Sequence, residues 1–136
     1  MTMKPLLVLF ALAVAACAQP GAPPVCTAPL KPAVAIDLYF GRDKANGGEV
    51  TEAEWGTFLA EVVTSRFPEG LSVFDSTGQY REPSGRIVRE RSKRLVVIVF
   101  DAPAHKAKVI EIVDAYKQRF GQNSVFRVEQ PVCAGL

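Results

Sequence analysis

Basic side chains gather in one stretch of this 136-residue sequence. Between Gln79 and Arg94 there are six basic residues and two acidic ones, whereas acidic residues outnumber basic ones in the rest of the chain after Cys17. Guanidinium groups bind carboxylates and phosphates through paired hydrogen bonds, so the cluster suits an anionic polymer, a lipid head group or an acidic protein. The predicted anion- or partner-binding residues are Arg42, Arg81, Arg86, Arg89, Arg91 and Lys93. The alternative is a charged hairpin edge that prevents association between sheets.

A second candidate site consists of Asp37, Tyr39 and Arg127. These residues occupy outward positions of the first and last predicted strands, so we expect them on the face of the sheet that carries no helix. Such a face could hold a small ligand or an active site. The alternative is an ordinary cross-strand ion pair between Asp37 and Arg127.

The sequence offers few other reactive groups. His105 is the only histidine, and one histidine without a spare cysteine cannot build a typical zinc site. We expect it to be a surface or boundary residue without a catalytic role. The glycines from Gly41 to Gly48 precede a helix, but the glutamates that follow would repel a phosphate there. No metal, cofactor or catalytic residue is therefore predicted, and the sequence favours a protein that is not an enzyme.

The N-terminal segment is typical of an export signal. Lys4 precedes an apolar run over residues 6–13, and small residues lead to Val14-Ala15-Ala16-Cys17. This ending resembles the lipobox of bacterial lipoproteins, which implies that Cys17 carries a lipid and becomes the mature N-terminus. Ala18 follows instead of an aspartate, which favours the outer membrane. Cleavage after Ala18, giving a soluble periplasmic protein, is the competing interpretation.

The two remaining cysteines, Cys26 and Cys133, lie near opposite ends of the mature chain. In an oxidising compartment we expect them to form a disulfide that closes nearly the whole domain. The alternative is two unrelated buried thiols.

The chain divides into three parts. Residues 1–16 form the signal peptide, and residues 17–32 form the lipidated N-terminus and a tether rich in proline and alanine. Residues 33–136 form a single α+β domain, whose 49% hydrophobic composition, taken over the whole chain, suffices for one core.

Hydrophobic periodicity predicts the elements of that domain. Alternation predicts a first strand over residues 34–40, and the capping box Thr51-Glu52-Ala53-Glu54 begins a helix that ends before Pro68. A short strand over residues 71–74 follows, then a hairpin turning at residues 83–85, whose second arm runs into the apolar strand over residues 95–100. Asp101 is expected to cap a second helix, which ends at Gly121, and residues 125–129 form the last strand.

This order, β-α-β-β-α-β, is the ferredoxin-like pattern. It predicts an antiparallel sheet of strand order 4-1-3-2 with both helices on one face. In that topology the first and last strands are neighbours, which agrees with the expected disulfide.

Several segments resemble an uncharacterised family of short exported bacterial proteins that has only a domain-of-unknown-function label. The segments that carry the resemblance are Tyr39-Phe40-Gly41-Arg42, residues 48–55, residues 66–71, residues 86–90 and Ser92-Lys93. The resemblance implies an extracytoplasmic, single-domain protein and supplies no activity.

The sequence thus favours a cell-envelope lipoprotein that binds a partner through its Arg-rich hairpin end. The alternative is a small extracytoplasmic ligand-binding protein or enzyme that uses the helix-free sheet face. The expected partners are the membrane, through the lipid on Cys17, and an anionic envelope component or acidic protein. A homodimer through the helix-free face is a further possibility, and nucleic acid is not expected in this compartment.

Overall fold

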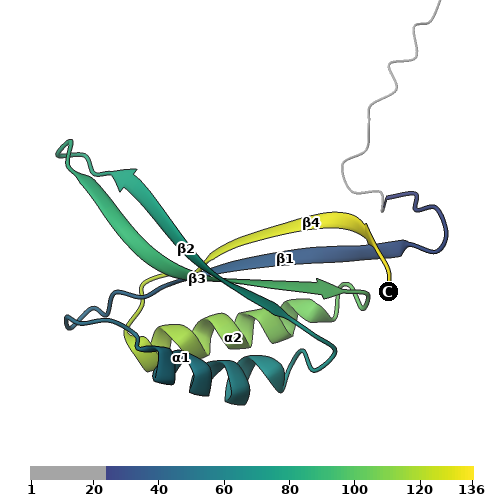
Figure 1. Cartoon of the computed structure of the whole chain (residues 1–136), viewed down its shortest axis with the longest axis horizontal. Helices are drawn as coiled ribbons and strands as arrows, with labels where there is room; N and C mark the ends of the chain where they lie inside the picture. Colours follow the sequence, from purple (N-terminus) through teal and green to yellow (C-terminus); the bar gives the residue numbers. More distant parts are fainter. Residues whose placement is uncertain (1–23) are drawn as a thin grey trace, which may run out of the picture.

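Four antiparallel strands form one sheet, and both helices pack on the same face of it (Figure 1). This is a computed structural model, and it describes residues 24–136. The elements are β1 (Lys31–Gly41), α1 (Glu52–Phe58), η1 (Leu59–Thr64), β2 (Ser72–Arg81), β3 (Ile87–Val99), α2 (His105–Phe120) and β4 (Phe126–Ala134). The predicted α+β class and ferredoxin-like element order are confirmed.

The strand order across the sheet is β2-β3-β1-β4, which is the predicted order 4-1-3-2 read from the other edge. The apolar run Leu95–Val99 lies in β3, an inner strand whose two edges pair with β1 and β2. In β1, the side chains of Ile36, Leu38 and Phe40 are buried under the helices as the alternation predicts.

The hairpin strands are longer than predicted. β2 runs without a break from Ser72 to Arg81 and pairs with β3 back to Ile87. Hydrophobic alternation fades along residues 75–81 because the hairpin extends past the helix layer, where neither face is buried (Figure 1). Backbone pairing nevertheless continues to the turn at residues 82–86, where Gly85 has a φ of +88°.

The first helix begins with the predicted capping box. The Thr51 hydroxyl accepts a hydrogen bond from the Glu54 amide at 3.2 Å, and the Glu54 carboxylate accepts one from the Thr51 amide at 2.8 Å. After Phe58 the chain continues as the π-helix η1, which the apolar stripe did not predict. Val63 from η1 is still buried in the core.

The start of the second helix differs from the prediction. α2 begins at His105, and Ala104 occupies the N-cap position without a side-chain hydrogen bond. Asp101 does not cap it, because the chain first makes a turn in which the Asp101 carbonyl accepts from the Ala104 amide. The predicted end is confirmed, since Gly121 adopts the left-handed conformation at the C-cap.

Aromatic rings fill the centre of the core. Phe40 lies within 6 Å of the rings of Trp55, Phe58 and Tyr116, measured between ring centroids. The Tyr116 hydroxyl is satisfied by donating to the Gly41 carbonyl at 2.8 Å. Burial raises the pKa of this phenol far above its ordinary value.

The predicted disulfide joins Cys26 to Cys133, with their Cα atoms 5.6 Å apart. It lies where the start of β1 meets the end of β4, since Pro32 is paired with Cys133. β1 begins at Lys31, two residues before the expected start of the domain. The signal peptide and Cys17 lie outside the described residues. Within residues 24–136 no helix is long and apolar enough to cross a membrane.

Candidate functional site

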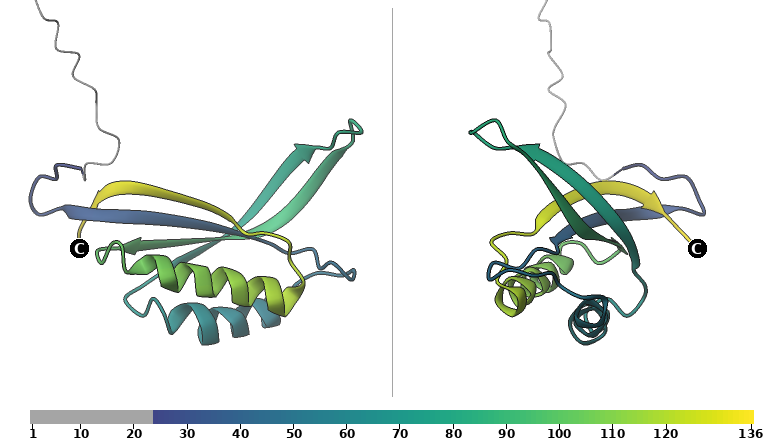
Figure 2. Two further views of the ribbon diagram at one scale, coloured as in Figure 1. Left: turned by 180° about the vertical axis from the view of Figure 1, so that it is seen from behind. Right: turned by 60° about the vertical axis from the view of Figure 1, so that its left-hand side comes forward.

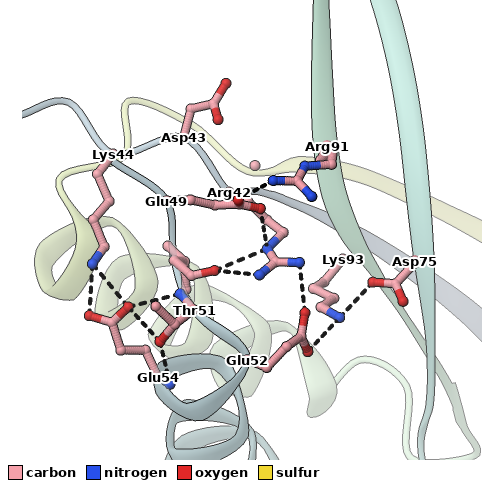
Figure 3. A network of polar contacts seen from close by, with 12 residues as sticks. Arg42, Asp43, Lys44, Glu49, Thr51, Glu52, Glu54, Asp75, Arg91 and Lys93 are labelled. Atoms are coloured by element: carbon pink, nitrogen blue, oxygen red, sulfur yellow. Dashed lines mark hydrogen bonds and ion pairs between the residues drawn. The ribbon is translucent and has the colours of Figure 1, made fainter. Parts of the chain in front are cut away.

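The Arg-rich hairpin projects away from the helices at the end of the sheet opposite the disulfide (Figure 2). Its base packs against the loop that leads into α1, which brings the predicted cations next to glutamates. Figure 3 shows the resulting network of ion pairs. Most of these cations are therefore neutralised within the chain.

Arg42 fixes the loop before α1. Its Nε and Nη2 atoms donate to the Val50 carbonyl at 3.0 and 2.6 Å, and its Nη1 donates to Glu52 at 2.7 Å. Nε also lies 3.0 Å from a carboxylate oxygen of Glu49. All of these contacts are internal, so Arg42 acts first as a structural residue.

Lys93 is buried, with 5% of its surface exposed, although it lies in the basic stretch. Its ammonium donates to Glu52 at 2.9 Å and to Asp75 at 2.5 Å. Burial alone lowers the pKa of Lys93, but the hydrogen bonds to the two carboxylates outweigh it, so the pKa is raised. The same contacts lower the pKa of Glu52 and of Asp75, with the hydrogen bond from Lys93 as the largest cause.

The other hairpin cations divide into two groups. Arg91 is paired with Glu49, and Arg86 with Glu82 at 2.7 Å. Arg81 and Arg89 form no ion pair within the part of the chain that the structure describes. The hollow at the hairpin base, of about 380 Å³, is lined by both signs of charge, including Arg42, Glu52 and Asp75. Its carboxylates oppose the binding of an anion.

Glu54 joins the capping box to the network. Its carboxylate accepts from Lys44 at 2.7 and 2.9 Å. The hydrogen bond from Lys44, followed by those from Thr51, lowers the pKa of Glu54 from 4.5 to about 2.

This lowered pKa predicts acid sensitivity. A carboxyl whose pKa falls on folding stabilises the folded chain above its unfolded pKa, and this stabilisation is lost as the pH falls through its folded pKa. We expect the free energy of unfolding to decrease between about pH 4.5 and about 2, and to decrease less in Glu54→Gln. Glutamine keeps the cap hydrogen bond but cannot ionise.

The measurement is urea denaturation at several pH values, followed by the fluorescence of Trp55, the only tryptophan. Glu69→Gln is the matched control, since Glu69 forms no ion pair within residues 24–136. Equal pH dependence in the wild type and Glu54→Gln would contradict the assignment.

The predicted pair between Asp37 and Arg127 is wrong. Asp37 lies opposite Val128, and Arg127 lies opposite Leu38, whose side chain points toward the helices. Directly opposed residues share a face, so Arg127 is on the helix side of the sheet. There it pairs with Glu129 on its own strand.

Asp37 instead pairs with Arg94 of β3, a residue that was not predicted as part of this site. Arg94 Nε lies 2.5 Å from Asp37 Oδ1, and this hydrogen bond raises the pKa of Arg94. Its guanidinium lies 5.9 Å from the Tyr39 ring centroid and 5.8 Å from that of Phe74. Both charges are therefore compensated within the helix-free face, which we call the open face.

The rest of the open face is mainly apolar. The exposed fractions are 67% for Phe126, 51% for Phe74 and 41% for Ile98. Tyr39 packs against Phe126 across the strands, with ring centroids 5.8 Å apart. From the sequence, these apolar residues were not predicted as part of the site. The run Leu95–Val99 was a signal for them, because it is apolar on both faces and its second face is therefore suited to binding.

His105 is buried, with 1% of its surface exposed, so the expectation of a surface or boundary residue is wrong. Because α2 begins at His105, this side chain lies one turn before Val109 on the helix face that packs on the sheet. Its Nε2 lies 3.4 Å from a carboxylate oxygen of Glu129, and neither ring nitrogen has a hydrogen-bond partner among the described residues. The sequence contained one signal for this burial, because His105 lies four residues before Val109 and therefore on the same helix face.

A second hollow, of about 570 Å³, lies between the segment that precedes β2, the end of β3 and the C-terminal residues. It is lined by apolar side chains including Phe67, Leu71 and Phe100, with Lys108 at its side. The Lys108 ammonium donates a hydrogen bond to the Asp101 carboxylate at 3.1 Å. In residues 24–136 no group of three or more histidine, cysteine or acidic residues is arranged to bind a metal.

Comparison with known proteins gives a family and a fold. Residues 35–136 match a family described as "Protein of unknown function (DUF3574)". A phage SAM lyase in complex with S-methyl-5'-thioadenosine has a TM-score of 0.57 at 17% identity, over 76% of this chain and 90% of that chain. A phage SAM lyase in the apo state has a TM-score of 0.55 at 16% identity, over 75% of this chain and 84% of that chain. No curated protein matches. Identities this low show similarity of fold only.

Proposed function

We propose that this chain, which belongs to the DUF3574 family of proteins of unknown function, is a cell-envelope lipoprotein that binds a protein partner through its open face. In this proposal the chain is exported, Cys17 carries the lipid, and the domain acts as a binding module and not as an enzyme.

One observation carries the choice of surface: large apolar side chains remain exposed on the open face while its central charges are compensated. Monomeric proteins rarely expose contiguous apolar surface of this kind, which marks interaction sites. Aromatic residues and arginine are also enriched where protein interfaces concentrate their binding energy. Phe74, Phe126, Tyr39 and Arg94 provide this composition together.

The Arg-rich hairpin is less suited to be the primary binding surface. An anion that bound Arg42, Arg91 or Lys93 would have to displace the carboxylates of Glu49, Glu52 or Asp75. These ion pairs join the hairpin to the loop before α1, so breaking them would also loosen the packing between the hairpin and this loop. Arg81 and Arg89 remain able to steer an acidic partner toward the domain.

The arrangement of the domain is compatible with a tether. The segment that leads into β1 lies at the disulfide end, opposite the hairpin tip (Figure 1). A lipid attached ahead of this segment would leave the hairpin tip directed away from the attachment point.

Photocrosslinking in intact cells tests this proposal. A photoreactive phenylalanine derivative replaces Phe126 in the full-length chain, and the matched control carries it at Ile110, which is 54% exposed on α2. We expect a protein adduct from position 126 and none from position 110. Absence of adducts at position 126, or equal adducts at both positions, would contradict the proposal.

A further inference from the structure

A free strand edge lies at the end of β3. β2 pairs with β3 only as far as Ser72 opposite Val96, whereas β3 continues to Val99 and pairs with β1 up to that residue. Val97, Ile98 and Val99 therefore have a neighbouring strand on one side only. In an antiparallel pair, alternate residues direct their amide and carbonyl groups to opposite sides. At least one of these three residues therefore directs both groups to the side that lacks a strand.

The second hollow follows this edge. Every residue from Val96 to Asp101 lines it. Consecutive side chains of a strand point to opposite faces, so a hollow on one face of the sheet would be lined by every other residue. The hollow therefore runs alongside the strand, where a further strand of the sheet would lie. Phe67 and Leu71, from the segment before β2, also line it.

The edge is apolar on both sides of the sheet. Val97 and Val99, which are 3% and 6% exposed, point toward the helices, and Ile98 lies on the open face. Phe100, just beyond the strand, is 57% exposed. Exposed strand edges usually carry charged residues or proline, which prevent pairing with other chains, but residues 95–100 include neither.

The backbone groups of the edge distinguish a peptide from other apolar ligands. An acyl chain in the hollow would bury the free amide and carbonyl without hydrogen-bond partners, which is unfavourable. An extended peptide supplies a partner for both groups, and its alternate side chains contact the apolar walls. The hollow is therefore better suited to a polypeptide strand than to a lipid.

The charges at the rim favour a basic residue in that strand. Lys108 donates to Asp101 and lies 5.5 Å from the Phe67 ring centroid, so its charge is compensated. Glu69 also lines the hollow, and it forms no ion pair within residues 24–136. Its carboxylate is free to pair with a lysine or arginine beside the apolar segment.

The segments of this chain itself fit the edge poorly. A second copy could offer its outer strands, but β2 contains Asp75, and β4 contains Arg127 and Glu129. These charges would meet the apolar walls. The segment ahead of the described residues contains Pro20 and Pro23, and proline has no amide to donate to a neighbouring strand.

We infer that the edge of β3 at residues 97–99 binds an extended apolar segment of a partner protein, flanked by a basic residue, which joins the sheet as an added strand. This inference goes beyond the proposed function, because it assigns a second binding site at the edge of the sheet. It does not depend on binding at the open face.

The test uses a synthetic peptide of consecutive valines with one lysine at each end, blocked termini and a fluorescent dye. The full chain is present with phosphatidylcholine vesicles, whose zwitterionic lipid does not attract the lysines, and vesicles alone give the background. We expect a rise in fluorescence anisotropy with a Kd below about 1 mM. Mass spectrometry should show slower hydrogen exchange over residues 97–99 when the peptide is bound.

Two N-methylated versions of the peptide test strand addition. Each version carries methyl groups on alternate amides, so one set points toward β3 and the other points away from it. We expect one version to bind like the parent and the other to bind at least about tenfold more weakly, because it loses its hydrogen bonds to the edge.

Variants of the chain test the site. Phe100→Ala removes an exposed wall and is expected to weaken binding by about tenfold, whereas Ile110→Ala on α2 should leave it unchanged. Glu69→Lys is expected to weaken binding by a few-fold and to favour a peptide with glutamates in place of the lysines. Urea denaturation followed by Trp55 fluorescence verifies that each variant is folded.

Four results would overturn the inference. The first is no binding of the parent peptide up to about 1 mM, and the second is equal binding of both methylated versions. The third is protection of residues 97–99 by palmitate but not by the peptide, which would indicate a lipid site. The fourth is protection without peptide that increases with protein concentration, which would indicate a second copy at the edge. The crosslinking from position 126 is independent of all four.

Discussion

Loss of the Cys26–Cys133 disulfide is expected to lower the free energy of unfolding by about 4–5 kcal/mol. The two cysteines are separated by 107 residues, and the entropy of the unfolded chain that such a crosslink removes corresponds to this magnitude. A domain of this size is stable by about 5–15 kcal/mol, so the reduced form retains only part of its stability or unfolds.

The effect should be concentrated at the edge of the sheet. β4 is an edge strand that pairs only with β1, and the disulfide joins its end to the segment before β1. Without the crosslink we expect β4 to separate first, which would expose the buried His105 beside Glu129.

Urea denaturation of the oxidised and reduced wild type measures this directly, with Trp55 as the probe because it is 4% exposed in the core. Cys26→Ala together with Cys133→Ala should reproduce the reduced form. Identical urea midpoints for the oxidised and reduced chain would refute the expected contribution.

Cys17→Ser is expected to abolish lipid attachment completely. If the segment Val14-Ala15-Ala16-Cys17 is a lipobox, its thiol is the sole attachment atom, and serine cannot replace it. The variant keeps the alternative cleavage site after Ala18, so we expect it to move from the membrane fraction to the soluble fraction.

Labelling with radioactive palmitate, followed by membrane fractionation, gives the result. Cys26→Ala with Cys133→Ala is the matched control, because it removes two thiols and leaves Cys17 in place. Label that persists in Cys17→Ser would refute attachment at Cys17, and a wild type without label would favour cleavage after Ala18 and a soluble protein.

The two surfaces of this domain have different physical characters. On the helix side of the hairpin, Arg91 and Lys93 are paired with carboxylates around the start of α1. The open face carries exposed apolar side chains around one compensated ion pair. Hydrophobic burial drives most protein association, whereas exposed charges mainly control its rate and specificity. This difference is the reason for assigning binding to the open face.

Local patterns in the sequence were sufficient for most of the elements and for their order, and the number and positions of the cysteines predicted the disulfide. The capping box at Thr51, the alternation of β1 and the glycine at position 121 act over a few residues, so the sequence alone determined them. The strand order followed from the element order and the handedness of crossovers.

Only the tertiary structure decided which side chains meet. Asp37 pairs with Arg94, 57 residues away, because the register of β1 against β3 and β4 places Arg127 on the other face. The burial of Lys93 and of His105 depends in the same way on packing between distant segments. A shift of one residue in strand register exchanges the faces of all its side chains, and no local pattern fixes that register at polar positions.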